Sequence, residues 1–299
     1  MADQLAIEAA DLRKNYGATE ALRGLNLEVP AGSICGFLGR NGAGKTTTIK
    51  ILLGIARPTS GRARVLGRAP EDINAGVQIR QRTGFVSEEK DLYEYMTVEE
   101  MIRFTAAFFP RWRRDLEQSY RHTFQLPPDG KIKALSRGAR TKLALLLALC
   151  RDAELLVLDE PTSGLDPTMI EQILQTLVSH VASQETTVFF SSHQIAEVDQ
   201  IADRIALIDR GRAVVAGPLD DLRERYRRIQ LVFDGDAPQP AFRAAGVVRV
   251  RREGRVLSVL SSAGSQGVLD EARALGSVSA NVLPVTLKEI FLETLTAED

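Results

Sequence analysis

One segment restricts the fold of this chain more than any other: residues 39–46 read Gly-Arg-Asn-Gly-Ala-Gly-Lys-Thr. They fit the pattern G-x-x-x-x-G-K-[ST] of a phosphate-binding loop. The run before the loop, residues 33–38, is strand-like, and Ile49 and Leu52 after it lie at helical spacing. A strand, a glycine-rich loop and a helix in this order predict an α/β core that binds phosphate groups.

The residue types in the loop suit this chemistry. Gly42 and Gly44 allow the backbone to wrap with its N–H groups pointing inward, and the next helix adds the positive end of its dipole. Lys45 can reach the outer phosphates, and the Thr46 hydroxyl can hold Mg²⁺. The loop alone leaves GTPases, nucleotide kinases and transport ATPases open. We assign nucleotide binding to Gly39, Arg40, Asn41, Gly42, Ala43, Gly44, Lys45, Thr46 and Thr47.

The acidic pair Asp159 and Glu160 directly follows the apolar run of residues 155–158. Such a run is typical of a strand buried on both faces of a parallel sheet, and ligands of these sheets bind at the carboxyl ends of the strands. Asp159 can bind Mg²⁺ there, and Glu160 can orient or deprotonate an attacking water. The pair therefore predicts hydrolytic chemistry beside the phosphate loop.

The chain reads as a large domain followed by a small one. Residues 5–12 and 21–29 are strand-like, and after residue 150 strands alternate with helices, as in a parallel sheet. Residues 90–150 show a helical pattern, with a capping box at Thr97 and Glu100. We predict an α/β P-loop core with a mainly parallel sheet, an N-terminal antiparallel β subdomain, an inserted helical subdomain and a small α+β C-terminal domain. The predicted domains are residues 1–225 and 226–299.

Composition excludes several classes of protein. The 38 Lys and Arg residues nearly balance the 39 Asp and Glu residues, so the chain does not bind polyanions by bulk charge, and no nucleic-acid partner is expected. Cys35 and Cys150 lie in apolar segments, which argues against a disulfide framework and favours a reducing compartment. The longest uncharged apolar run, residues 143–150, is far shorter than the ~20 residues of a membrane-spanning helix. Any membrane function would need another chain.

Four further segments occur in the order in which one known family carries them: Tyr16, residues 135–139 (Leu-Ser-Arg-Gly-Ala), residues 163–166 (Ser-Gly-Leu-Asp) and His193. They resemble an adenine-stacking aromatic residue, the L-S-G-G-Q signature, the D-loop and the switch histidine. With these motifs, residues 5–225 resemble the ATP-binding subunit of an ABC (ATP-binding cassette) transporter. The single cassette and short C-terminal domain resemble bacterial exporters of the drug, antibiotic or lipid type.

The resemblance implies a site that one chain cannot complete alone. Two cassettes, identical or different, would close head to tail around two ATP molecules. Ser136, Gly138 and Asp166 would then face the nucleotide bound by the partner, where hydrogen-bond donors stabilise charge developing during phosphoryl transfer. Each chain would therefore supply half of each site.

Within one chain the resemblance implies roles for four side chains. Tyr16 would stack on adenine, and His193 would bond the γ-phosphate and position Glu160. His122 and His180, by contrast, are expected to be polar surface residues. The implied catalytic residues are Lys45, Glu160 and His193.

Two departures from the family pattern affect this expectation. Glu88 stands where the family usually has the Gln of the Q-loop, and Arg137 replaces the first Gly of the signature. A carboxylate can still ligate Mg²⁺ but adds negative charge near the triphosphate. Arg137 lacks the conformational freedom of glycine, although its guanidinium can reach a phosphate or a facing carboxylate. The predicted metal ligands are Thr46, Asp159 and Glu88.

The expected function is hydrolysis of MgATP on the cytoplasmic side of the membrane, as the peripheral subunit of a separately encoded permease. Residues 88–109 resemble the surface on which such cassettes receive a short helix from the membrane subunit, although helical-subdomain core explains most of their aromatic residues equally well.

Three alternatives remain beside this reading. A soluble ABC-type ATPase acting on ribosomes or DNA would typically carry two cassettes or a long coiled coil. A GTPase needs an N-K-x-D segment, and a small-molecule kinase needs an acceptor site; no N-K-x-D segment occurs in the sequence. The hypothesis of a nucleotide-binding module that does not hydrolyse ATP is supported only by the departures at Glu88 and Arg137.

Overall fold

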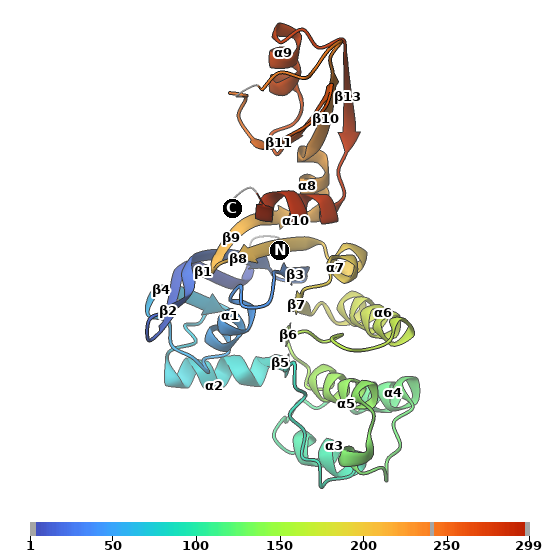
Figure 1. The fold of residues 1–299 in the computed structure, drawn as a ribbon. Coiled ribbons are helices and arrows are strands. Elements are labelled where there is room, and N and C mark those ends of the chain that lie inside the picture. Colours follow the sequence, from blue (N-terminus) through green and yellow to red (C-terminus); the bar gives the residue numbers. More distant parts are fainter. Residues whose placement is uncertain (1–3, 240–241, 297–299) are drawn as a thin grey trace. The chain divides into compact units, whose positions relative to one another are not determined.

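The computed structural model describes residues 4–239 and 242–296, which form two compact units (Figure 1). The first unit ends at Ala216 and the second begins at Gly217. This division falls slightly before the predicted boundary at residue 225, because helix α8 (Leu219–Arg225) groups with the C-terminal unit. Each unit has its own buried apolar cluster.

The first unit, up to the boundary strand β9, combines two sheets with seven α-helices among the described residues. The smaller sheet consists of β1 (Leu5–Tyr16), β2 (Thr19–Pro30) and β4 (Ser60–Val65). The larger sheet consists of β3 (Ile34–Leu38), β5 (Thr83–Val86), β6 (Leu155–Leu158), β7 (Thr187–Ser192), β8 (Arg204–Asp209) and β9 (Arg212–Pro218). The helices are α1 (Lys45–Leu52), α2 (Ile73–Arg82), α3 (Val98–Ala106), α4 (Arg114–Phe124), α5 (Arg137–Leu149), α6 (Pro167–Gln184) and α7 (Ile195–Ile201). In the described part of the chain, no helix is long and apolar enough to cross a membrane.

The larger sheet has the strand order β5-β6-β7-β3-β8-β9, and the pairs from β5 to β8 are parallel. Its two faces are covered by different elements. Phe37 packs with α1 and the smaller sheet, whereas Gly36 faces α7, where a Cβ would lie 2.3 Å from Val198 Cγ1. Figure 1 shows α6 and α7 on that second face. The carboxyl ends of β3, β6 and β7 therefore meet at one edge.

The smaller sheet is antiparallel, in the order β2-β1-β4, as predicted for the N-terminal region. Ile7 of β1 lies opposite both Val29 and Val65, and all three are buried. These apolar residues join α1 and one face of the larger sheet in a single cluster. The phosphate loop thus connects a buried strand to a helix packed between two sheets.

The helical subdomain lies between β5 and β6, as predicted. It contains α3, α4, α5 and the 3₁₀ turn η1 (Ile132–Ala134). Thr97 caps α3: its hydroxyl accepts from the Glu100 N–H, and the Glu100 carboxylate accepts from the Thr97 N–H. The predicted capping box is therefore present, and it fixes the start of this helix.

The second unit is an α+β domain with an antiparallel sheet in the order β11-β12-β10-β13. Glu253 of β11 pairs with Val256 of β12, so a tight hairpin turn at Gly254 joins the two strands. Helix α9 packs Val268 and Ala272 against buried residues of β10 and β12. The elements after α8 are β10 (Arg227–Val232), β11 (Val247–Glu253), β12 (Val256–Ser261), α9 (Gln266–Ala274), β13 (Ser279–Pro284) and α10 (Leu287–Thr296).

His180 is buried, so its prediction as a surface residue is wrong. It lies on α6 three residues after Leu177, and helical spacing places both side chains on the face that packs inward. Its Nδ1 lies 3.0 Å from the Tyr120 hydroxyl on α4. Burial, with a smaller effect of the Arg113 cation, lowers the pKa of His180 to about 4.

This lowered pKa predicts a specific acid sensitivity. The unfolded chain protonates His180 near pH 6.5 and the folded chain only near pH 4, so the stabilisation is complete above pH 6.5 and is lost as the pH falls through this window. The expected loss in unfolding free energy is about 2 kcal/mol at pH 5 and about 3 kcal/mol at pH 4. Urea denaturation at pH 7.5 and pH 5, followed by Trp112 fluorescence, measures it in the wild type and in His180→Asn. His122→Asn, at an exposed position on α4, is the control. Equal pH dependence in the wild type and His180→Asn would contradict the prediction.

Candidate nucleotide-binding and hydrolysis site

The phosphate loop follows β3, whose five residues are all buried. Two of its glycines adopt backbone conformations that other residues resist: φ is +80° at Gly42 and +112° at Gly44. At Gly44 a Cβ would also lie 2.8 Å from the Ala21 carbonyl oxygen. The loop surrounds a cavity of about 330 Å³, which is lined by Ala21, Arg40, Asn41, Gly42, Gly44, Lys45, Thr46, Thr47 and Glu88.

Lys45 is the buried cation of this cavity. Its side chain is 7% exposed, and its Nζ donates a hydrogen bond of 2.7 Å to the Gly39 carbonyl. The same Nζ lies 3.1 Å from Glu160 Oε1. The sequence alone places Lys45 in the loop, but the parallel arrangement of β3, β7 and β6 brings it to the acidic pair.

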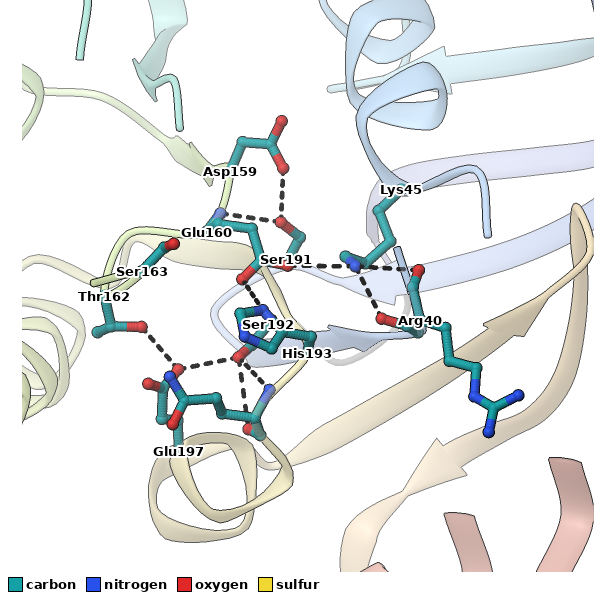
Figure 2. A network of polar contacts seen from close by, with 12 residues as sticks. Arg40, Lys45, Asp159, Glu160, Thr162, Ser163, Ser191, Ser192, His193 and Glu197 are labelled. Atoms are coloured by element: carbon teal, nitrogen blue, oxygen red, sulfur yellow. Dashed lines mark hydrogen bonds and ion pairs between the residues drawn. The ribbon is translucent and has the colours of Figure 1, made fainter. Parts of the chain in front are cut away.

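Ser191 organises the acidic pair and was not predicted from the sequence. Strands β6 and β7 are parallel neighbours with Leu158 opposite Phe190, which places Ser191 beside Asp159. The Ser191 hydroxyl donates to Asp159 Oδ1 at 2.6 Å and accepts from the Glu160 N–H at 2.9 Å (Figure 2). Its position two residues before His193, directly after the β-branched and aromatic run of residues 187–190, was the available signal.

Glu160 lies at the centre of the site. Its carboxylate is 6% exposed: Oε1 faces Lys45, and Oε2 lies 2.8 Å from His193 Nδ1 (Figure 2). His193 itself is about half exposed on the loop after β7. A buried carboxylate held between an ammonium and an imidazole, next to a phosphate cavity, is suited to orient water and accept its proton.

The predicted Mg²⁺ ligands suit a hard cation. Thr46 and Glu88 line the same cavity, and the Asp159 carboxylate uses Oδ1 for its bond with Ser191. Within the described residues no group of three or more His, Cys, Asp or Glu side chains is placed to hold a metal by itself. Mg²⁺ in such sites usually takes one or two carboxylates together with phosphate oxygens and water, and the oxygen donors present fit that pattern.

The signature-like segment begins helix α5. The Ser136 hydroxyl accepts from the Ala139 N–H at 3.2 Å and caps the helix. Gly138 packs directly against Met169 on α6: a Cβ would lie 1.9 Å from Met169 Sδ, so the methionine side chain would have to move. Arg137 donates to the Ser163 hydroxyl at 3.3 Å, so this departure from the family pattern links the signature to the D-loop of the same chain.

Asp166 caps helix α6, where its Oδ1 accepts from the Met169 N–H at 3.0 Å. Neither Asp166 nor the signature residues Ser136 and Gly138 are among the described residues that line the phosphate cavity. Tyr16 lies outside that lining as well: it ends β1, is half exposed, and has Lys14 Nζ 4.8 Å from its ring centre. The structure therefore brings Lys45, Glu160 and His193 together, but not these residues.

Fold and site together define a P-loop nucleoside triphosphatase. The family model described as ABC transporter matches residues 22–163, and a model of an AAA domain matches residues 131–199. A bacitracin transport ATP-binding protein of Bacillus licheniformis is 32% identical over 96% of this chain and 94% of its own length. A daunorubicin resistance ATP-binding protein of Streptomyces coeruleorubidus is 31% identical over 100% of this chain and 98% of its own.

A solved structure of an ATP-binding subunit of an ABC transporter also superposes on this chain. Its TM-score is 0.66 at 28% identity, and the match covers 73% of this chain and 92% of that one. The chain belongs to the ATP-binding subunits of ABC transporters. It is an ATPase that powers transport, and the predicted family, fold class and activity are confirmed.

Proposed function

We propose that this chain hydrolyses MgATP at the site formed by Lys45, Glu160 and His193, and that the reaction drives a permease on a separate chain in the export direction. The position of Glu160 carries the proposal: its buried carboxylate lies between the other two side chains beside the phosphate cavity. The names of the relatives that are matched over nearly their full length support an antibiotic-like or drug-like cargo.

Each side chain has a defined task in this reaction. The loop N–H groups and Lys45 bind the phosphate oxygens. Glu160 accepts a proton from water while the water oxygen bonds to the γ-phosphorus and the bond to the ADP oxygen breaks. His193 holds Glu160 Oε2 and would bond the γ-phosphate when ATP is bound. Mg²⁺, held by Thr46, Asp159 and Glu88, would neutralise charge on the phosphate oxygens when bound.

The remaining motif residues belong, in this proposal, to the site of a second cassette. Ser136 is exposed at the N-terminus of α5, where the helix dipole favours an anion. Gly138 lies in the first turn of the same helix and next to Met169 of α6. Asp166 caps α6 by accepting from the Met169 N–H, so it lies close to the signature. Their position outside the chain's own cavity supports a head-to-tail dimer, homomeric or heteromeric, in which they complete the partner's site. Tyr16 remains our candidate for adenine stacking.

The permease contact is proposed at a patch of four exposed aromatic residues, called here the aromatic patch: Tyr93, Tyr95, Phe104 and Phe108. The ring centre of Tyr93 lies 5.8 Å from that of Tyr95 and 5.6 Å from that of Phe104, and Phe104 lies 5.1 Å from Phe108. Phe104 lies on α3, which also contributes Met101 and Thr105 to a groove of about 250 Å³. Contiguous exposed aromatic surface is typical of a protein interface. Docking there places the chain at the cytoplasmic face of the membrane as a peripheral subunit.

Purification of the tagged chain in mild detergent tests this function. We expect a multispanning membrane protein to copurify with the wild type, and its recovery to fall at least about tenfold in Tyr95→Ser/Phe108→Ser, because each lost aromatic anchor costs on the order of 1–2 kcal/mol. ATP turnover of the isolated variant should stay within about twofold of wild type. Ile73→Ser/Val77→Ser, at exposed apolar positions of α2, is the matched control. Ribosomal proteins or DNA in place of the membrane protein would refute the transport assignment.

A further inference from the structure

Lys90 is a buried cation that the reaction described above does not use. It follows β5 on the loop after Glu88 and is 7% exposed. Its Nζ donates to two backbone carbonyls, those of Glu88 at 3.0 Å and Glu160 at 3.2 Å. Burying an ammonium costs free energy unless it is hydrogen-bonded. Here the two hydrogen bonds join the loop after β5 to the loop after β6.

The contact with Glu160 acts on an unusual backbone conformation. Glu160 has φ of +46°, in the left-handed region that residues with a Cβ rarely adopt. Such a conformation is strained and persists only where surrounding groups enforce it. The Glu160 N–H is held by Ser191, and its carbonyl accepts from both Lys90 and the Ser163 N–H. Lys90 is the one side chain that donates to this carbonyl among the described contacts.

The Lys90 segment also borders two of the proposed sites, the phosphate cavity and the groove beside the aromatic patch. Glu88, whose carbonyl Lys90 also holds, lines the phosphate cavity. Lys90, Asp91 and Leu92 line the groove beside the aromatic patch. One ammonium therefore connects the backbone of the groove segment with the backbone of the hydrolytic carboxylate.

We propose that Lys90 is a positioning residue for Glu160: by binding its carbonyl it maintains the left-handed conformation that directs the carboxylate toward Lys45 and His193. The inference rests on the proposed role of Glu160 in hydrolysis. It predicts that loss of Lys90 slows the chemical step without weakening nucleotide binding.

Steady-state ATP hydrolysis by the purified full-length Lys90→Met variant tests the inference. Met keeps the length and volume of the side chain but cannot donate, so kcat should fall about ten- to hundredfold through misplacement of Glu160. The KM for ATP should stay within about threefold, because the phosphate loop is unchanged. The melting temperature should not fall, since an apolar side chain replaces a buried charge. Lys133→Met, at an exposed lysine of the same subdomain, is the matched control.

Crystal structures of the wild type and Lys90→Met provide a readout that does not depend on turnover. We expect Glu160 to leave the left-handed region or its carboxylate to lose the 2.8 Å contact with His193. Unchanged geometry with kcat within twofold of wild type would overturn the inference, as would parallel losses of stability and ATP affinity. Glu160→Gln separates the two proposals: if it hydrolyses ATP normally, the role of Glu160 fails; if it is inactive while Lys90→Met is normal, only the role of Lys90 fails.

Discussion

Replacing Glu160 with Gln is expected to lower kcat for ATP hydrolysis by at least about a hundredfold, the contribution typical of a positioned general base. Gln keeps the volume of the side chain and can still face Lys45 and His193, but it cannot accept the proton of the attacking water. Phosphate release by the full-length chain measures kcat, and equilibrium titration with MgATP measures the dissociation constant. The dissociation constant should change by no more than about threefold, because the phosphate loop is intact.

Glu185→Gln is the matched control for this substitution. Glu185 is exposed at the end of α6, so removing its charge should leave kcat unchanged. A Glu160→Gln variant that binds MgATP and hydrolyses it at more than a third of the wild-type rate would show that another group activates the water. Binding without turnover in the wild type, even in the presence of the permease, would instead support the non-hydrolysing alternative.

Replacing Lys45 with Met is expected to have the second large effect, on nucleotide binding. Lys45 is the buried cation that lines the phosphate cavity, and hydrogen bonds to a charged group contribute about 1.5–3 kcal/mol. The dissociation constant for MgATP should therefore rise about ten- to hundredfold. Hydrolysis should become undetectable at ATP concentrations that saturate the wild type.

The same substitution should also lower stability, because Glu160 would remain buried without its ammonium partner. The double variant Lys45→Met/Glu160→Gln separates these effects: it removes the uncompensated charge, so its melting temperature should recover while its affinity for MgATP stays low. Lys50→Met, at an exposed lysine of the same helix, controls for general changes in α1. Wild-type affinity in Lys45→Met would contradict the assignment of the loop.

The site was predicted best where its chemistry is local in the sequence. The turn at Gly42 and Gly44 and the entry into α1 are encoded within a dozen residues, and the structure shows the positive φ angles that this pattern requires. Asp159 and Glu160 could be placed at a strand end because a buried parallel strand has a recognisable apolar run. The strand is present as predicted, and it pairs in parallel with β5 and β7.

Local sequence patterns could not predict the contacts of side chains whose partners lie on other strands or helices. Helical spacing places His180 on the apolar face of α6, but its hydrogen-bond partner, Tyr120, comes from α4, which no pattern within α6 specifies. The sequence shows that Arg137 departs from the signature pattern. It does not show that Arg137 bonds to Ser163, because Ser163 lies 26 positions later in the chain. A pattern within one segment does not specify such contacts.

The sequence by itself determined the family, the phosphate loop and the identity of the acidic and imidazole side chains, because each depends on residue types at fixed spacing. Only the tertiary structure decided how they meet. The order of β6, β7 and β3 in the sheet brings Ser191 to Asp159 and Lys45 to Glu160, and the loop after β5 brings Lys90 to the Glu160 carbonyl. Strand order and loop packing follow from burial of the whole core, a property to which distant segments contribute together.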